Sequence, residues 1–332
     1  MRLGILAYST HSGLGYQSRS YVKHLNPVKI LDIDITRLNG MNHYEWYPEA
    51  RVTKGYPSIE DCHWITDNVD VVLMAETPLN YELYKIARDK GVKTVNVINP
   101  EFYDHIKYPQ YDMPDLIILP SVWLQNEITA HATSRMTKVV QLHHPVDLEE
   151  FPFTERSSHR FMHIAGKPAT HDRNGTWDFL NACSDGIVTT QSEEMARMIR
   201  RRYRNTRVMT NIESPQDIYR YGDVLVMPRK YGGNCLPLNE ALASGMPVIM
   251  PDISPNNHLL PKEWLVPATV TDHFEPRTRV DIYSTDIQAL YNKLDWFRTQ
   301  DMPTLSRQAY EIAKTISWDA LRPKYLEVLE SL

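Results

Sequence analysis

The sequence predicts an α/β fold with two domains, each a parallel sheet flanked by helices. Short apolar, β-branched runs alternate with helical segments along the chain. These runs are continuous, as expected for strands that are buried on both faces. The length of 332 residues is sufficient for two such domains with sizeable cores.

The first half of the chain repeats this alternation. We expect strands at 2–8, 28–35, 69–75, 93–98, 115–119 and 138–142, with helices at about 15–25, 79–89 and 121–131. Residues 37–58 are predicted to form a long loop, and its segment 42–48 is rich in aromatic residues that could stack on a sugar or a base.

The second half continues the pattern. Strands are expected at 159–165, 186–189, 207–211, 223–227 and 248–250, with helices from about 175, at 192–203 and at 236–244.

Composition limits the classes of protein to consider. The chain is 42% hydrophobic and 23% charged, with a formal net charge of -5, so contact with nucleic acid requires a local basic patch. The apolar runs are too short for a membrane span or a signal peptide. The three cysteines, Cys62, Cys183 and Cys235, share no metal-ligand spacing. We therefore expect a cytoplasmic protein in a reducing compartment.

A glycine loop lies between the first expected strand and helix. Gly13 and Gly15 stand at a strand-to-helix turn that suits a phosphate, and Arg19 follows. Ser18 occupies the place of the third glycine of a dinucleotide fingerprint, which weakens that interpretation. Asp32 and Asp34 could be a metal-binding pair or a ribose-binding acid, but ordinary residues at the end of a strand are favoured.

A second glycine loop, at 228–235, joins a strand to the helix expected from Leu236. Such a loop presents backbone N–H groups and the helix dipole to an anion. Glu240 lies about one turn into the helix, where its carboxylate could reach a hydroxyl of the same ligand. A nucleotide or a nucleotide-sugar fits both features.

Residues 233–249 resemble the signature of retaining GT-B glycosyltransferases of family 4. The matching positions are Gly233, Leu236, Pro237, Glu240, Ala241, Ala243, Gly245, Pro247, Val248 and Ile249. Gly232 stands where the first glutamate of the signature belongs, Asn234 where an aromatic residue belongs, and Cys235 where a glycine belongs. Residues 143–151 resemble the family's crossing between domains, and 316–329 resemble its last helix.

The resemblance implies the GT-B architecture, with two Rossmann-like domains facing across a cleft and a C-terminal helix that crosses back to the first domain. Residues 1–147 with 316–332 would form the acceptor domain, and residues 148–315 the nucleotide-sugar domain. The reaction would move a hexose or pentose to an acceptor hydroxyl with retention, without a metal or cofactor. A UDP-sugar is the favoured donor.

The resemblance also implies roles for particular residues. Glu240 would hold the ribose, and Lys167 and Arg173 would neutralise the diphosphate as charge develops on it. The loop would contribute the amides of Gly233, Asn234, Cys235 and Leu236. Since Gly232 replaces the glutamate that contacts the transferred sugar, another group must hold that sugar, and Asn234 is one candidate.

In the first domain, four polar residues follow expected strands and are candidate cleft residues: Ser12, Glu76, Glu101 and His105. Ligands bind at the carboxyl ends of parallel strands. Glu76 is the best candidate for acceptor contact or acid–base catalysis. A role as a helix cap or loop hydrogen-bonder is the alternative for each.

The sequence leaves alternatives open for the acceptor and for the class of protein. Six arginines lie within eleven residues, at 197, 200, 201, 202, 204 and 207, and could meet the phosphates of DNA whose hydroxymethylated bases accept the sugar. A solvated helix end is the plainer interpretation, and a protein or glycan is the other acceptor. A dinucleotide-dependent oxidoreductase or epimerase, or a non-catalytic nucleotide-sugar-binding module, is the alternative to a glycosyltransferase.

Overall fold

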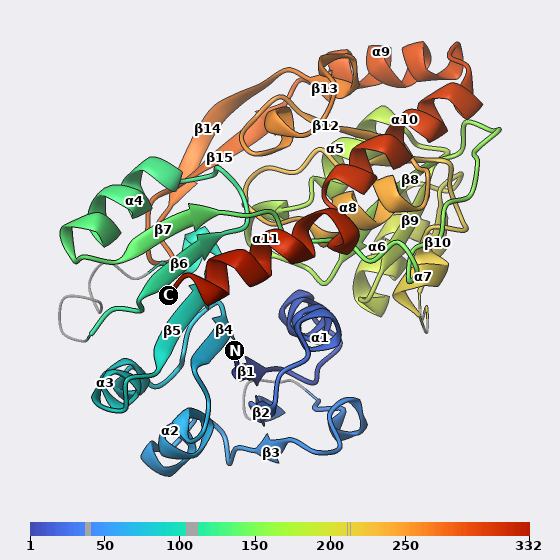
Figure 1. Cartoon of the computed structure of the whole chain (residues 1–332). Helices are drawn as coiled ribbons and strands as arrows, with labels where there is room; N and C mark the ends of the chain where they lie inside the picture. Colours follow the sequence, from blue (N-terminus) through green and yellow to red (C-terminus); the bar gives the residue numbers. More distant parts are fainter. Residues whose placement is uncertain (37–40, 104–111, 211, 213) are drawn as a thin grey trace. The chain divides into compact units, whose positions relative to one another are not determined.

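A computed structural model describes residues 1–36, 41–103, 112–210, 212 and 214–332 (Figure 1). The chain divides into two compact units. The first consists of Met1–His144, Pro276–Thr278 and Asp319–Leu332, and the second of Pro145–Glu275 and Arg279–Trp318.

The first unit contains a seven-stranded parallel sheet in the order β3-β2-β1-β4-β5-β6-β7. Its strands are β1 Leu3–Ala7, β2 Lys29–Asp32, β3 Arg51–Val52, β4 Val71–Ala75, β5 Lys93–Val97, β6 Leu116–Leu119 and β7 Lys138–Gln141. The central strands β1 and β4 are buried along their whole length, as their continuous apolar sequences predict. This confirms the expected parallel sheet.

Helices join these strands and begin at residues suited to that position. They are α1 Gly13–Leu25, α2 Ile59–Thr66, α3 Glu82–Asp89 and α4 Gln125–Ser134, with short 3-10 turns at η2 Tyr44–Trp46 and η3 Pro100–Phe102. The Ser12 hydroxyl accepts the Gly15 N–H at 3.1 Å and caps α1. Ser58 and Asp61 form a capping box at α2.

The last helix, α11 Trp318–Glu330, belongs from Asp319 onward to the first unit. Tyr325 is fully buried there, and its hydroxyl donates to the carbonyl of His143 at 3.0 Å. Arg322 Nε donates to the carbonyl of His24 at 2.8 Å. The C-terminal residues are thus anchored in the first unit by packing and by hydrogen bonds.

The second unit contains a six-stranded parallel sheet in the order β10-β9-β8-β11-β12-β13. Its strands are β8 Phe161–Gly166, β9 Ile187–Thr190, β10 Arg207–Met209, β11 Val224–Val226, β12 Val248–Pro251 and β13 Leu265–Val266. The helices are α5 Thr176–Ala182, α6 Glu193–Arg202, α7 Pro215–Ile218, α8 Leu236–Ala243, α9 Ile287–Arg298 and α10 Met302–Thr315, and the 3-10 turns are η5 Thr170–Asp172, η6 Asn256–His258 and η7 Lys262–Trp264. Both units therefore have the strand order of Rossmann-like folds.

Several elements differ from the sequence-based expectation. Part of the predicted loop at 37–58 forms the edge strand β3, which pairs with β2 through Leu31 and Arg51. An antiparallel hairpin, β14 Ala268–Phe274 and β15 Val280–Thr285, was not predicted, and neither were α2, α7, α9, α10 and β13. Most of β14 is exposed, so its sequence lacks the continuous apolar run that marks a buried strand.

The start of α1 lies so close to the turn after β1 that residue 15 must be glycine. A Cβ on Gly15 would lie 2.0 Å from the carbonyl oxygen of Thr10. Gly15→Ala should lower the free energy of unfolding by about 3 kcal/mol, because the backbone must move to relieve the clash. Urea titration of the purified protein measures this loss.

Gly91→Ala is the matched control. Gly91 has φ of +72° but no atom within 4 Å of its Cβ position, so only backbone strain of about 1 kcal/mol should result. Equal effects at the two positions would contradict the proposed clash.

Candidate functional site

The candidate site of the second unit lies where its chain reverses winding direction. Strands β8 and β11 are neighbours, but the chain continues from them toward opposite edges of the sheet. Loops that follow two such strands border a crevice, which is the usual ligand position in open α/β sheets. Here these loops are 167–175 and 227–235.

The two loops are held together by their backbones. Gly175 has φ of +71°, and a Cβ there would lie 2.0 Å from the carbonyl oxygen of Pro228. The N–H of Lys230 donates to the carbonyl of Arg173 at 2.8 Å. Sequence-distant residues are therefore fixed beside one another at the crevice.

Basic side chains gather on these loops. Lys167 is exposed, Arg173 is half-buried, and Arg229 is only 4% exposed. The guanidinium of Arg173 lies over the ring of Tyr231, 5.3 Å from its centroid. Lys230 instead lies 3.5 Å from a carboxylate oxygen of Asp178, which balances its charge. Lys167, Arg173 and Arg229 all add positive charge to these two loops.

The first turn of α8 lies next to these cations. Cys235 precedes the helix, Pro237 occupies its first turn, and no side chain forms a capping hydrogen bond there. The N-terminal amides and the helix dipole therefore favour an anion. The loop residues predicted to supply amides, Gly233 and Asn234, immediately precede this turn.

Glu240 lies on α8 and is half-buried. The hydroxyl of Tyr219 donates to Glu240 Oε2. Burial raises the pKa of the Glu240 carboxyl to about 7, although the Tyr219 hydrogen bond acts in the opposite direction. The sequence alone did not indicate Tyr219 as a partner of Glu240.

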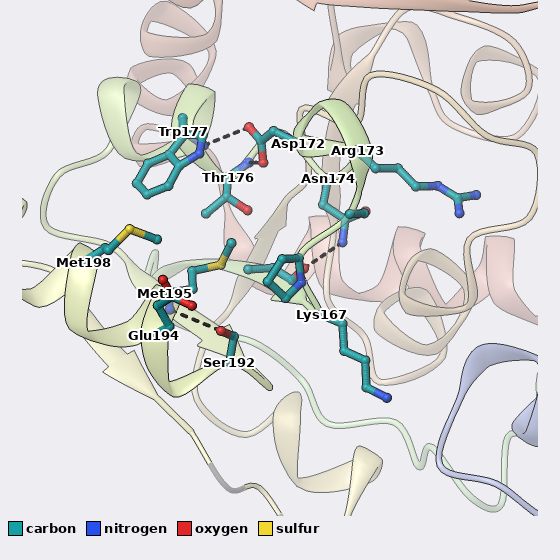
Figure 2. Close-up of a pocket in the computed structure, with 13 residues that line it drawn as sticks. Lys167, Asp172, Arg173, Asn174, Thr176, Trp177, Ser192, Glu194, Met195 and Met198 are labelled. Carbon is teal, nitrogen blue, oxygen red and sulfur yellow. Dashed lines mark hydrogen bonds between the residues drawn. The ribbon is translucent and has the colours of Figure 1, made fainter. Parts of the chain in front are cut away.

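A pocket of about 290 Å³ borders the loop after β8 (Figure 2). Lys167 and Arg173 line it together with Trp177, Met195 and Met198. In Figure 2 the two basic side chains extend away from Trp177 and Met198, while Asp172 lies beside Trp177 and Glu194 lies beside Met195. This arrangement suits a ligand with both charged and flat apolar parts.

In the first unit the corresponding reversal of winding lies between β1 and β4. Glu76 directly follows β4 and has φ of +65°, a strained conformation for a residue other than glycine. Asn99 Nδ2 donates to Glu76 Oε1 at 3.1 Å. Gly13 and Gly15 open α1 after β1, while Glu101 is buried within η3. His105 lies outside the described residues.

An aromatic cluster lies beside the start of α1. His11 and His43 have ring centroids 4.1 Å apart, and Trp46 lies 5.2 Å from His11. The ring centroids of Tyr16 and Trp46 are 5.7 Å apart, and the guanidinium of Arg19 lies 4.9 Å from the Trp46 ring centroid. The aromatic segment predicted at 42–48 therefore meets the glycine loop, with His11 and Tyr16 as members that the sequence did not indicate.

Two other sequence features lie apart from these candidate sites. Asp32 is buried and accepts hydrogen bonds from the backbone N–H and the hydroxyl of Ser9, at 3.0 and 2.6 Å. The six arginines from Arg197 to Arg207 are all exposed on α6 and the segment after it. Within the described ranges, no group of three or more His, Cys, Asp or Glu side chains is placed to hold a metal ion.

Comparison with solved structures identifies the fold. HepE from Anabaena, solved in complex with UDP, matches with a TM-score of 0.70 and 13% identity over 100% of both chains. A glycosyltransferase from Rickettsia africae ESF-5 matches with a TM-score of 0.69 and 12% identity over 99% of this chain and 98% of that one. Sucrose-phosphate synthase from Thermosynechococcus elongatus matches with a TM-score of 0.69 and 13% identity over 99% of both chains. The chain has the GT-B fold of these structures.

No protein-family model matches the chain. No curated protein sequence matches it either. Among the helices of the described residues, none has the length and apolar character to cross a membrane.

The raised pKa of Glu240 predicts a specific pH dependence of stability. The folded protein favours the protonated carboxyl, so this stabilisation is complete below the ordinary pKa of 4.5 and is lost as pH rises to about 7. Relative to Glu240→Gln, the wild-type protein should lose up to about 3 kcal/mol of unfolding free energy over this range. Urea titrations of both proteins between these pH values measure the difference.

Tyr219→Phe is the matched variant for this prediction. It removes the hydrogen bond that lowers the pKa of Glu240, so the loss of stability should extend to higher pH. A wild-type profile parallel to that of Glu240→Gln would show that Glu240 does not titrate in this range.

Proposed function

We propose that this chain is a glycosyltransferase that moves a sugar from a nucleotide-diphosphate-sugar, with a UDP-sugar favoured, to an acceptor hydroxyl. One observation carries the proposal. Lys167, Arg173, the uncapped first turn of α8 and Glu240 belong to the loops and helix at the β8–β11 crevice. The similar solved structures of HepE, which include complexes with UDP and with UDP-glucose, support this class of ligand.

The proposed roles follow from charge. The bond between the sugar and the diphosphate breaks with its electron pair remaining on the phosphate oxygen. Lys167, Arg173 and the amides of 233–236 stabilise that developing charge. Glu240 accepts a hydrogen bond from a ribose hydroxyl, for which Tyr219 is a competing donor. These cations would supply the charge stabilisation without a metal or cofactor.

The first unit is the proposed acceptor domain, and the second the proposed donor domain. Glu76 would contact the acceptor hydroxyl or take its proton, from the end of β4. The acceptor would bind near Gly13 and Gly15, at the start of α1. We also propose retention at the anomeric carbon, on the resemblance of residues 233–249.

The donor proposal predicts the effect of removing either cation. Lys167→Ala and Arg173→Ala should each weaken UDP binding about tenfold or more, because each removes a charge-assisted contact to phosphate. Lys262→Ala, at an exposed lysine in η7 of the same unit, should bind normally. Isothermal titration calorimetry with UDP measures all four proteins.

Three results would contradict the proposed function or the proposed site. Binding of NAD in place of UDP would support the dinucleotide-dependent alternative. Unchanged UDP affinity in both variants would place the diphosphate elsewhere. A Glu240→Ala protein that retains full sugar transfer and donor hydrolysis would exclude the proposed ribose contact.

The acceptor alternatives are a hydroxymethylated base of DNA and a hydroxyl of a protein or glycan. If DNA is the acceptor, the affinity of the protein for a DNA duplex should fall by about 10³-fold or more as the salt concentration rises from about 50 to about 200 mM. Arg200→Gln with Arg201→Gln should weaken such binding, since both side chains are exposed at the end of α6. Fluorescence anisotropy with labelled duplex measures it, and absence of binding at low salt excludes DNA.

A further inference from the structure

Arg156 is a buried arginine of the second unit, and its guanidinium donates to three backbone carbonyls. The residue is only 6% exposed. Nη1 donates to the carbonyls of Tyr219 and Gly222 at 2.9 and 3.2 Å, and Nη2 donates to the carbonyl of Ser244 at 2.8 Å. Ser244 is the C-cap residue of α8, where a positive charge is favourable. Arg156 therefore joins the segment 219–222 to the end of α8.

Two of these carbonyls belong to residues that contact Glu240. The hydroxyl of Tyr219 donates to Glu240 Oε2. The hydroxyl and the backbone N–H of Ser244 both donate to the carbonyl of Glu240, at 2.9 and 3.0 Å. One guanidinium thus holds both the residue that binds the side chain of Glu240 and the residue that binds its backbone.

The backbone of Arg156 is itself fixed against α10. Its N–H donates to the hydroxyl of Ser306 at 3.0 Å, and that hydroxyl donates to the carbonyl of Gly245 at 2.6 Å. Ser306 is fully buried. The guanidinium therefore acts from a fixed position beside the end of α8, and it forms a rigid support for the residues that it binds.

The orientation of the Glu240 carboxylate decides how well it can accept a hydrogen bond from a ribose hydroxyl. Tyr219 binds Oε2, so its competition with a ribose is confined to that oxygen, and Oε1 is the acceptor for the ligand. Hydrogen bonds weaken steeply when their angle is distorted. A Tyr219 ring that shifted would turn the carboxylate and weaken the ribose contact.

We propose that Arg156 is a positioning residue for Glu240. By holding the carbonyls of Tyr219 and Ser244, it sets the Glu240 carboxylate at the angle that a ribose hydroxyl of the donor requires. The inference rests on the proposed function and adds a residue that does not touch the ligand. It predicts that loss of Arg156 affects recognition of the ribose hydroxyls and leaves recognition of the diphosphate intact.

Calorimetry with UDP and with 2′,3′-dideoxy-UDP, which lacks both ribose hydroxyls, tests the inference. The wild-type protein should bind UDP about tenfold or more tightly than the dideoxy analogue, because only UDP can donate to the carboxylate. Glu240→Ala should remove most of this preference. Arg156→Met, which keeps the apolar stem and loses the donors, should do the same and leave the affinity for dideoxy-UDP unchanged.

Arg160→Gln is the matched control for a loss of stability alone. Arg160 is an exposed arginine of the same segment, and its Nε lies 2.7 Å from a carboxylate oxygen of the buried Asp223. Its removal should destabilise the second unit, because Asp223 loses its ion pair, and should retain the preference for UDP. Thermal unfolding without ligand reports the stability of each variant.

Arg156→Lys decides the question if Arg156→Met does not fold. Lysine keeps the positive charge at the end of α8 but lacks the planar fork that reaches three carbonyls. Its preference for UDP should fall between those of the wild-type protein and Glu240→Ala.

The outcomes separate the inference from the function on which it rests. If folded Arg156→Met keeps the wild-type preference, or loses affinity for both ligands by the same factor, Arg156 has only a structural role and the inference is overturned. An unchanged preference in Arg156→Lys overturns it where Arg156→Met is unfolded. Equal binding of both ligands by the wild-type protein overturns the ribose contact together with this inference, whereas no binding of UDP overturns the proposed donor itself.

Discussion

The close approach of Gly175 to the carbonyl of Pro228 is the constraint on which the candidate donor site depends. It brings the loop after β8 against the loop after β11, and the hydrogen bond from Lys230 to Arg173 continues that contact. A side chain at residue 175 would separate the loops. This one backbone contact lies where the strand order reverses, between β8 and β11. It fixes the positions of Arg173, Arg229 and the start of α8.

The site combines two electrostatic environments within one crevice. The loops supply positive charge at different depths, from exposed Lys167 to buried Arg229. Farther along α8, Glu240 is held where burial favours its neutral form. A ligand with an anionic part and neutral hydroxyl groups matches this division, whereas a uniformly charged or uniformly apolar ligand does not.

Much of the fold could be predicted because the buried strands have continuous apolar sequences, and α8 could be predicted from Pro237 near its start and Gly245 after its end. The hairpin β14–β15 escaped prediction since its exposed strand lacks this signal. Arg229 and Tyr219 were missed for another reason. Arg229 lies in the second glycine loop, but nothing in the sequence shows that its side chain reaches Gly232, and nothing links Tyr219 to Glu240.

The packing at Gly232 also limits how this site can change by mutation. A glutamate introduced there would meet the guanidinium groups of Arg173 and Arg229 below 3 Å and an unfavourable backbone angle. The two guanidinium groups are the ends of long side chains and can move aside, whereas the backbone angle at residue 232 belongs to the loop itself. The main obstacle to a glutamate at this position is therefore the positive φ, and the turn before α8 would have to change its path before the exchange could be tolerated.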